Sequence, residues 1–224
     1  TVTSFGKTSE LSDLSSLADI FVISVKESHL KGQGIINTGF KPKIDDWEFV
    51  NEGSYIEPEG HCAGQAMTMM WYYYQQKLRG KPQLFHLLDM SKSDDLFWQD
   101  NPTGYRFASV IQQDIDFNSL SRTLIRNLLD RGADALFWNA FIASMILTGE
   151  PQYVALRRYN ANRQFLYGHA IVAHKINVSE GKIFVTDPNY PGTERVITYS
   201  NGSFVPYNTK QNTTQADPEP YQGI

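Results

Sequence analysis

The sequence contains a single cysteine, Cys62, among its 224 residues. One cysteine excludes an intrachain disulfide framework and a cysteine-rich zinc cluster. No apolar run reaches the length of a membrane-spanning helix, and no signal-peptide pattern opens the chain. The net charge is −4 and the basic residues form no dense stripe. Charge therefore gives no reason to expect nucleic acid or an anionic membrane as a partner.

The composition is that of a globular protein. Apolar residues make up 41% of the chain, which is enough to bury a substantial core at this length. A single core and two lobes within one domain are equally compatible with this size. The sequence holds no sign of oligomeric state.

The first half of the chain predicts mostly helices. The segment 20–25 is rich in β-branched and aromatic residues and predicts a strand, and a second, short strand is expected at 47–50. The segment 62–78 contains no proline, and Gly80 and Pro82 supply its end, so it predicts a long helix. A turn is expected at 101–104. Helical spacing of apolar residues then predicts two further helices, at 120–132 and 133–147.

The second half of the chain predicts strands. Asn201-Gly202 lies between two apolar runs and is typical of a type I′ hairpin turn. The tail 208–224 is polar and proline-containing, so it predicts a linker or a loosely attached terminus. Helices followed by an antiparallel sheet indicate an α+β architecture. The predicted strands lie at 153–156, 170–176, 183–186, 195–199 and 204–207.

Three residues occur in the order that a cysteine-nucleophile enzyme requires. Cys62 directly precedes the long predicted helix, His169 opens a predicted strand, and Asp187 ends the next strand. A helix N-terminus and a nearby imidazolium both favour a thiolate, which makes Cys62 a candidate nucleophile. His169 would hold the thiolate and deliver a proton to the leaving group. Asp187 would fix the tautomer of His169, with Asn189 as the alternative residue for that third position.

The motifs around these residues resemble those of the papain-like cysteine peptidases. The matching runs are Gly60-His61-Cys62-Ala63-Gly64, Gly149-Glu150-Pro151, Gly168-His169-Ala170-Ile171-Val172 and Val185-Thr186-Asp187-Pro188. The resemblance is to the compact bacterial branch of that superfamily and to bacteriocin-processing peptidase domains, and it covers 51–207. It implies a helical lobe, with the nucleophile at a helix N-terminus, packed on an antiparallel sheet lobe. It further implies hydrolysis of peptide or isopeptide bonds in a peptide or protein substrate, with no metal or organic cofactor.

The resemblance also divides the chain into three parts. The segment 1–40 is expected to be an N-terminal extension with one strand, 41–207 the peptidase domain, and 208–224 a polar tail or linker. The chain begins with Thr1 rather than methionine, which is typical of a processed protein or an excised domain. A secreted or cell-envelope bacterial protein whose targeting segment has been removed would fit this pattern.

One element of the papain-like pattern is missing. Those enzymes usually carry a glutamine about half a dozen residues before the cysteine, and its amide contributes to the oxyanion hole. Ile56 occupies that position here. We assign the oxyanion role to Asn51, the nearest upstream amide, with Gln65 as a weaker candidate.

Two other functions remain open from the sequence. The same three residues serve transglutaminase-like acyltransferases, which transfer the acyl group to an amine. The missing glutamine favours a third possibility, a catalytically silent binding module with the papain fold. In that case Cys62 would be a buried structural residue, as isolated cysteines often are.

Overall fold

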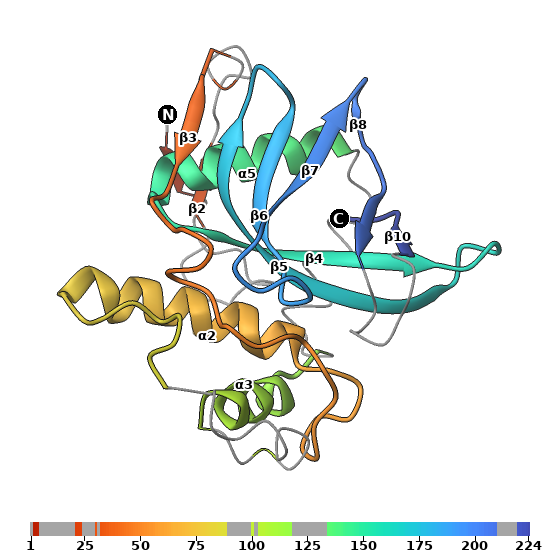
Figure 1. Cartoon of the computed structure of the whole chain (residues 1–224). Coiled ribbons are helices and arrows are strands. Elements are labelled where there is room, and N and C mark those ends of the chain that lie inside the picture. The colour runs from red at the N-terminus through yellow and green to blue at the C-terminus, as the bar shows by residue number, and fades with distance from the viewer. Residues whose placement is uncertain are drawn as a thin grey trace.

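The structure is a computed structural model, and it describes residues 2–4, 21–23, 30, 32–88, 100, 103–117, 134–209 and 219–224. The protein has an α+β fold in which helices and an antiparallel sheet form separate layers (Figure 1). The predicted helix at 120–132 and the turn residues 101–102 lie outside the described residues.

The central element is the long strand β5 (Phe165–Asn177), which belongs to a six-stranded sheet. On one side of β5, β3 (Ile35–Asn37) pairs with its C-terminal end and β4 (Gln152–Tyr159) with the rest. On its other side the sheet continues through β6 (Lys182–Thr186), β7 (Glu194–Ser200) and β8 (Ser203–Phe204). All these pairings are antiparallel.

Buried side chains leave β5 on both faces because side chains alternate along a strand. Ile171 and Ala173 belong to one apolar cluster, whereas Ala170 and Val172 belong to another. A register shift between Ala173 and Lys175 interrupts this alternation. β5 therefore forms part of two cores at once.

The first core lies between the sheet and α5 (Asp134–Thr148), which crosses one face of the sheet (Figure 1). Trp138, Ile142 and Met145 recur at helical spacing on α5 and are buried there. Trp138 stacks on Tyr199 of β7 with ring centroids 4.8 Å apart. The helix expected at 133–147 is thus present within one residue of its predicted bounds.

The second core lies between the sheet and two packed helices, α2 (Cys62–Gln75) and α3 (Thr103–Asp114). Ala63 and Ala66 of α2 belong to the same buried cluster as Ala170 and Val172 of β5. We call these four small residues the α2–β5 seam. Because none of them carries a long side chain, the helix can lie close to the strand.

The predicted helix at 62–78 corresponds to α2 followed by a short 3₁₀ helix, η1 (Lys77–Arg79). Gly80 ends it in the left-handed conformation, with φ of 82°. The helix α3 was not expected, since only a turn was predicted at its start. The strand expected at 47–50 was also wrong: the backbone there is irregular. Trp47 and Phe49 instead bury their rings in the second core.

The predicted hairpin at Asn201-Gly202 is present and connects β7 to β8. Both residues have positive φ, 53° and 82°, as a type I′ turn requires. The strand expected at 20–25 corresponds to β2 (Phe21–Ile23), which pairs with β1 (Val2–Ser4).

The C-terminal tail differs from the loose linker expected for 208–224. β9 (Tyr207–Thr209) pairs with β10 (Glu219–Tyr221). Tyr221 is 3% exposed, and Gly223 forms a bridge with Arg157 on β4. The tail residues within the described part of the chain are therefore attached to the sheet. None of the helices in the described ranges is long and apolar enough to cross a membrane.

Candidate active site

Cys62 is the first residue of α2, so its thiol lies at the end of the helix where backbone N–H groups have no intrahelical acceptors. One of these groups is already bonded, since the N–H of Gly64 donates to Oε1 of Gln112 (2.9 Å). The first helical bond joins the N–H of Gln65 to the carbonyl of His61 (2.9 Å). The N–H of Cys62 has no acceptor among the described residues. Cys62 as a whole residue is partly exposed.

The side chain of His169 on β5 lies close enough to the Cys62 thiol for its ring N–H and its charge to act on the sulfur. Burial alone would raise the pKa of this thiol. The hydrogen bond and charge of His169, together with the N–H groups of Ala170 and Ala63, outweigh burial and lower the pKa below that of a free cysteine. The surroundings of Cys62 therefore favour a thiolate.

Asp187 holds the other side of the His169 ring. The Nε2 atom of His169 lies 2.7 Å from Oδ1 of Asp187, and both side chains are almost completely buried. Because this bond occupies Nε2, Nδ1 is the nitrogen left to face the thiol. Cys62, His169 and Asp187 thus interact in series and come from three separate elements or element ends.

The interactions among these three residues also determine the charges of His169 and Asp187. Burial would lower the pKa of His169, but the charge and hydrogen bond of Asp187, and then the thiolate, raise it above the usual value. Burial would raise the pKa of Asp187, but His169 and the donors around the carboxylate lower it instead. The favoured state is a thiolate, an imidazolium and a carboxylate in sequence.

The pKa values of two other buried histidines are shifted in the opposite direction. Burial lowers the pKa of His61 and of His174 to about 4. His61 packs against Tyr105, and His174 stacks on Phe40. Both are therefore neutral near pH 7, which leaves His169 as the charged one of the three.

Asn189, the alternative for the third position, lies in the same network but has a different part in it. Its amide nitrogen lies 3.3 Å from Nε2 of His169 and 3.2 Å from Oγ1 of Thr209. Its backbone N–H donates to Oδ1 of Asp187 (2.9 Å). Asp187 is thus the acceptor for His169, and Asn189 supports Asp187.

Asn51, the residue assigned to the oxyanion hole, lies at the start of α2. Its Oδ1 accepts the N–H of His61 (2.7 Å), directly before Cys62, and its own N–H donates to the carbonyl of Pro188 (3.0 Å). The side chain is 5% exposed. Its Nδ2 has no acceptor within the described parts of the chain and is available as a donor.

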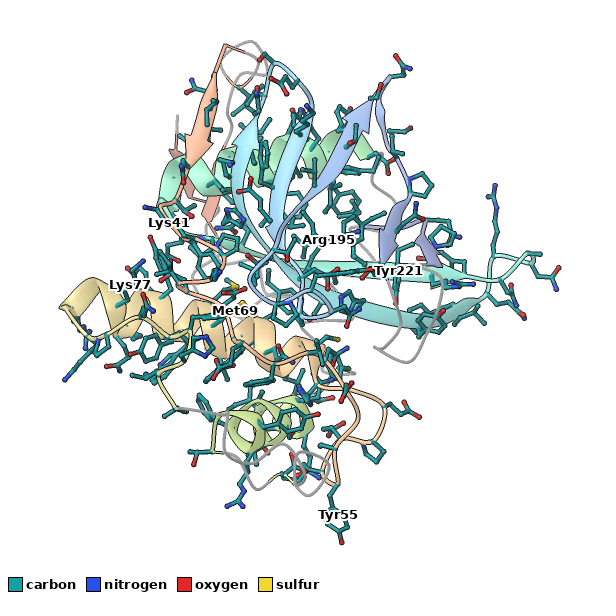
Figure 2. The ribbon with its side chains drawn as sticks, viewed as in Figure 1. Lys41, Tyr55, Met69, Lys77, Arg195 and Tyr221 are labelled. Atoms are coloured by element: carbon teal, nitrogen blue, oxygen red, sulfur yellow. The ribbon has the colours of Figure 1, made fainter. Side chains whose placement is uncertain are left out.

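The other positions considered for this role are placed differently. The backbone N–H of Ile56 donates to Asp100 (2.8 Å), and the neighbouring Tyr55 points outward into solvent (Figure 2). Gln65 is 1% exposed and lies nearly one turn along α2 from Cys62. Its Nε2 has no hydrogen-bond partner in the described structure. Two side-chain amide nitrogens without acceptors in the described structure therefore flank Cys62 in the sequence: Nδ2 of Asn51 before it and Nε2 of Gln65 after it.

Two residues of this network were missed in the sequence. The hydroxyls of Tyr207 (2.8 Å) and Thr209 (2.7 Å) both donate to Oδ2 of Asp187. They lie on β9, at the boundary of the segment expected to be a linker. The alternation of Tyr207, Asn208 and Thr209 was the available signal for a strand, because it places the first and third side chains on one face.

Within the described residues, no group of three or more His, Cys, Asp and Glu side chains is arranged to hold a metal ion. In comparisons with protein-family models, curated proteins and solved structures, none matches this chain.

Proposed function

We propose that this protein is a cysteine-nucleophile hydrolase that cleaves peptide or isopeptide bonds with Cys62, His169 and Asp187. The observation that carries the proposal is the unbroken chain from a thiol at a helix N-terminus through His169 to Asp187. A structural cysteine needs neither a lowered pKa nor an imidazolium beside it. The resemblance to papain-like peptidases in motif order supports the same conclusion.

The arrangement of layers agrees with a papain-like lobe structure. Cys62 belongs to the helical layer of α2 and α3, and His169 belongs to the sheet. Asp187 directly follows β6. The nucleophile and its base therefore come from opposite sides of the α2–β5 seam.

The first half of the reaction forms a thioester. The Cys62 thiolate attacks the carbonyl carbon of the scissile bond, and the carbonyl oxygen takes up the negative charge. When the tetrahedral intermediate collapses, the C–N bond breaks. Nδ1 of the His169 imidazolium gives its proton to the departing nitrogen, and an amine leaves.

The second half regenerates the thiolate. Neutral His169 takes a proton from a water molecule, and the resulting hydroxide attacks the thioester carbon. The C–S bond breaks, a carboxylic acid is released and the thiolate–imidazolium pair is restored. Asp187 remains ionised throughout and keeps the His169 ring in one orientation.

The oxyanion can be stabilised by two donors at the start of α2. These are the N–H of Cys62 and Nδ2 of Asn51, which lack acceptors among the described residues. The α2 dipole acts in the same direction, since its positive end faces the site. Papain-like peptidases take this amide from a glutamine at the position that Ile56 occupies here. In this protein Asn51 would supply it instead.

The rate at which iodoacetamide alkylates Cys62 between pH 5 and 9, followed by intact mass, tests the proposal. We expect rapid labelling that persists well below the free-thiol pKa of about 8.5. His169→Gln should shift labelling to alkaline pH, because the imidazolium is lost. His174→Gln is the matched control, since it removes a buried histidine from the same strand whose ring stacks on Phe40 instead.

A peptide-library screen with the parent protein and Cys62→Ala then defines the reaction. Hydrolysis that disappears in Cys62→Ala supports the peptidase. If an added amine is acylated faster than water, the protein is an acyltransferase instead. Slow labelling that appears only at alkaline pH, with the same rate in the parent and in His169→Gln, would refute the enzyme proposal in favour of a binding module.

A further inference from the structure

The carboxylate of Asp187 is held by four donors, two on each oxygen. Oδ1 receives the Nε2 proton of His169 and the backbone N–H of Asn189. Oδ2 receives the hydroxyls of Tyr207 and Thr209 at 2.8 and 2.7 Å. A carboxylate offers about four lone-pair directions, so this set occupies all of them. Its orientation is therefore determined equally by His169 and by β9.

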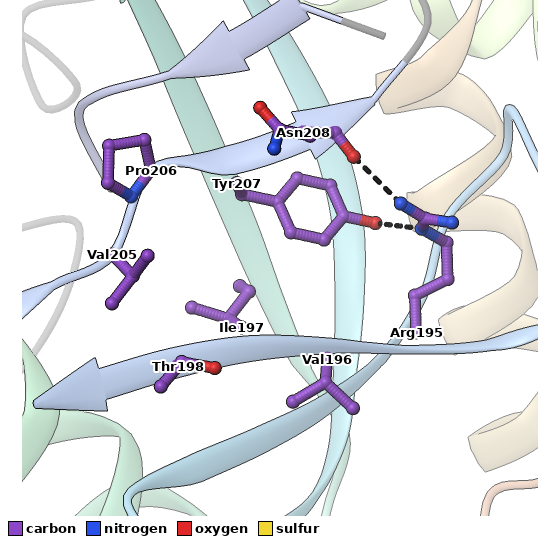
Figure 3. A pocket seen from close by; sticks show the side chains of 8 residues that line it. All are labelled: Arg195, Val196, Ile197, Thr198, Val205, Pro206, Tyr207 and Asn208. Atoms are coloured by element: carbon purple, nitrogen blue, oxygen red, sulfur yellow. Dashed lines mark hydrogen bonds between the residues drawn. The ribbon is translucent and has the colours of Figure 1, made fainter.

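The surroundings of Tyr207 force its proton toward Asp187. Nε of Arg195 donates to the Tyr207 oxygen (2.9 Å), while Nη2 donates to the carbonyl of Asn208 (2.7 Å), as Figure 3 shows. A guanidinium can only donate, so the phenolic proton is left for Oδ2. Burial, and then the charge of Asp187, raise the pKa of Tyr207, which keeps it a donor at all relevant pH values.

Thr209 is constrained in the same way. Nδ2 of Asn189 donates to its Oγ1 (3.2 Å), so the hydroxyl proton is directed to Asp187. The side chain of Thr209 is fully buried. Water therefore cannot replace this donor without a local opening of β9.

The C-terminal segment holds β9 in place. Tyr221 of β10 lies opposite Tyr207 in the strand pair, and its ring centroid is 5.9 Å from that of His169. Arg157 of β4 exchanges backbone hydrogen bonds with Gly223 at 2.8 and 3.1 Å. β4 is itself paired to β5 next to His169, with Leu156 opposite that residue. The segment thus connects both members of the His169–Asp187 pair.

We propose that Tyr207 and Thr209 are positioning residues whose hydroxyls keep Asp187 ionised and aimed at His169. The inference rests on the proposed function and assigns the C-terminal strands to the site. Loss of either hydroxyl leaves a buried carboxylate with fewer donors, which makes its charged form less stable. Asp187 then supports the imidazolium less well, and the thiolate at Cys62 is weakened in turn.

Matched substitutions separate this role from packing. Thr209→Val removes a hydroxyl that bonds Asp187, while Thr186→Val removes an equally buried hydroxyl that has no hydrogen-bond partner in the described structure. Tyr207→Phe is paired with Tyr199→Phe, whose ring packs on Trp138. Thr209→Ser keeps the hydroxyl and serves as the rescue. Circular dichroism and thermal unfolding establish that each variant is folded.

The readout is the pH profile of Cys62 alkylation. At pH 6 we expect labelling to fall about tenfold in Thr209→Val and in Tyr207→Phe, from the loss of one hydrogen bond to a charged group. The midpoint of the profile should move toward alkaline pH, and Thr209→Ser should restore it. Thr186→Val and Tyr199→Phe should keep the parent profile.

The possible results are distinguishable. If the parent labels rapidly at low pH and Thr209→Val matches Thr186→Val, the positioning role is overturned and the proposed function stands. If Thr209→Val does not fold, the comparison of Tyr207→Phe with Tyr199→Phe decides in the same way. If the parent itself labels only at alkaline pH, no reactive pair exists and both proposals fail.

Discussion

His61, His169 and His174 are all buried, yet their surroundings give them different charges. Burial removes water from each ring and disfavours the charged form. At His61 and His174 this effect dominates and the pKa falls to about 4. At His169, Asp187 is close enough to reverse it. The carboxylate at 2.7 Å therefore accounts for the raised pKa of His169, whereas Glu194, 3.9 Å from His174, does not offset burial there.

The neutral histidines lead to a prediction for how the unfolding free energy depends on pH. A histidine whose folded pKa is about 4 and whose unfolded pKa is about 6.5 stabilises the protein above pH 6.5, and this contribution is lost as the pH falls toward 4. We expect the difference in unfolding free energy between pH 7 and pH 4.5 to be about 2 kcal/mol smaller in His174→Gln than in the parent.

Urea denaturation of both proteins at the two pH values measures this difference. The comparison cancels the contribution of Asp46, whose pKa burial raises to about 6 and which acts in the opposite direction. Equal pH dependence in the two proteins would show that folding does not lower the pKa of His174.

Asn51 is the subject of a second prediction at this scale. If Nδ2 of Asn51 binds the oxyanion, Asn51→Ala should lower the turnover rate of a peptide substrate by about 10²–10³-fold. Alkylation of Cys62 forms no oxyanion, so its rate should stay within a few-fold of the parent. Gln65→Leu is the comparison, because it removes the other unbonded amide near Cys62. A larger loss in Gln65→Leu than in Asn51→Ala would transfer the role to Gln65.

Individual residues differed in how far the sequence could predict their places. Cys62, His169 and Asp187 lie at predicted element ends, so local sequence patterns were enough to identify them as candidate site residues. Tyr207 and Thr209 reach Asp187 through side-chain hydrogen bonds across 20 and 22 residues, and local sequence patterns do not reveal such contacts. Asn51 is linked to Pro188 through a backbone bond that no side-chain pattern encodes.

Among the elements, α2 and α3 approach each other closely at Gly64. A Cβ at this position would overlap the carbonyl of Ala108 on α3, which is backbone and cannot rotate away. The N–H of Gly64 also donates to Gln112 of α3. The absence of a side chain at Gly64 therefore allows the first turn of α2, with Cys62, to be supported by α3.

Gly64→Ala should separate the two helices. We expect a loss of about 1–3 kcal/mol in unfolding free energy from overpacking, together with slower labelling of Cys62. Gly34→Ala is the matched control, because a Cβ there would meet no atom within 4 Å, and its stability should change by less than about 0.5 kcal/mol. Chemical denaturation of both variants measures the difference. If Gly64→Ala were as stable as Gly34→Ala, α3 must move to accommodate the added methyl group.

Elements with strong local signals were predicted and those formed by tertiary packing were not. Gly80 and the Asn201-Gly202 turn mark their element ends through backbone conformation alone. The residues 47–50 carry strand-forming side chains, but Trp47 donates from Nε1 to Thr68 of α2 and packs as core. The helix α3 was hidden because only Tyr105 and Ala108 of its apolar side chains are buried, while Phe107 and Val110 are exposed.

At the scale of the whole molecule, two apolar cores share β5, and the C-terminal segment closes one of them. Tyr221 belongs to the same core as Trp138 and Ile171, although it comes from the last residues of the described chain. The site lies where the two cores meet. Its geometry therefore depends on the packing of both.

Tyr221→Ala should affect the fold and the site together. Removing a buried aromatic ring is expected to cost about 3–5 kcal/mol of unfolding free energy, and labelling of Cys62 at pH 6 should fall because β10 no longer holds β9. Val205→Ala, at a position 47% exposed, should change stability by less than about 0.5 kcal/mol. Thermal and urea unfolding give the stabilities. A Tyr221→Ala protein with parent stability and labelling would show that β10 is dispensable.

Three of the four residues of the α2–β5 seam are alanines, and the fourth is Val172. Each added methyl group there would move the sulfur relative to the imidazole before it unfolded the protein, because the thiol and the ring are on opposite sides. Side-chain volume at Ala63, Ala66 and Ala170 therefore bears directly on the distance between the two members of the proposed reactive pair. A related sequence with a bulky residue in this seam would be expected to keep the fold and lose the chemistry, even with all three reactive side chains intact.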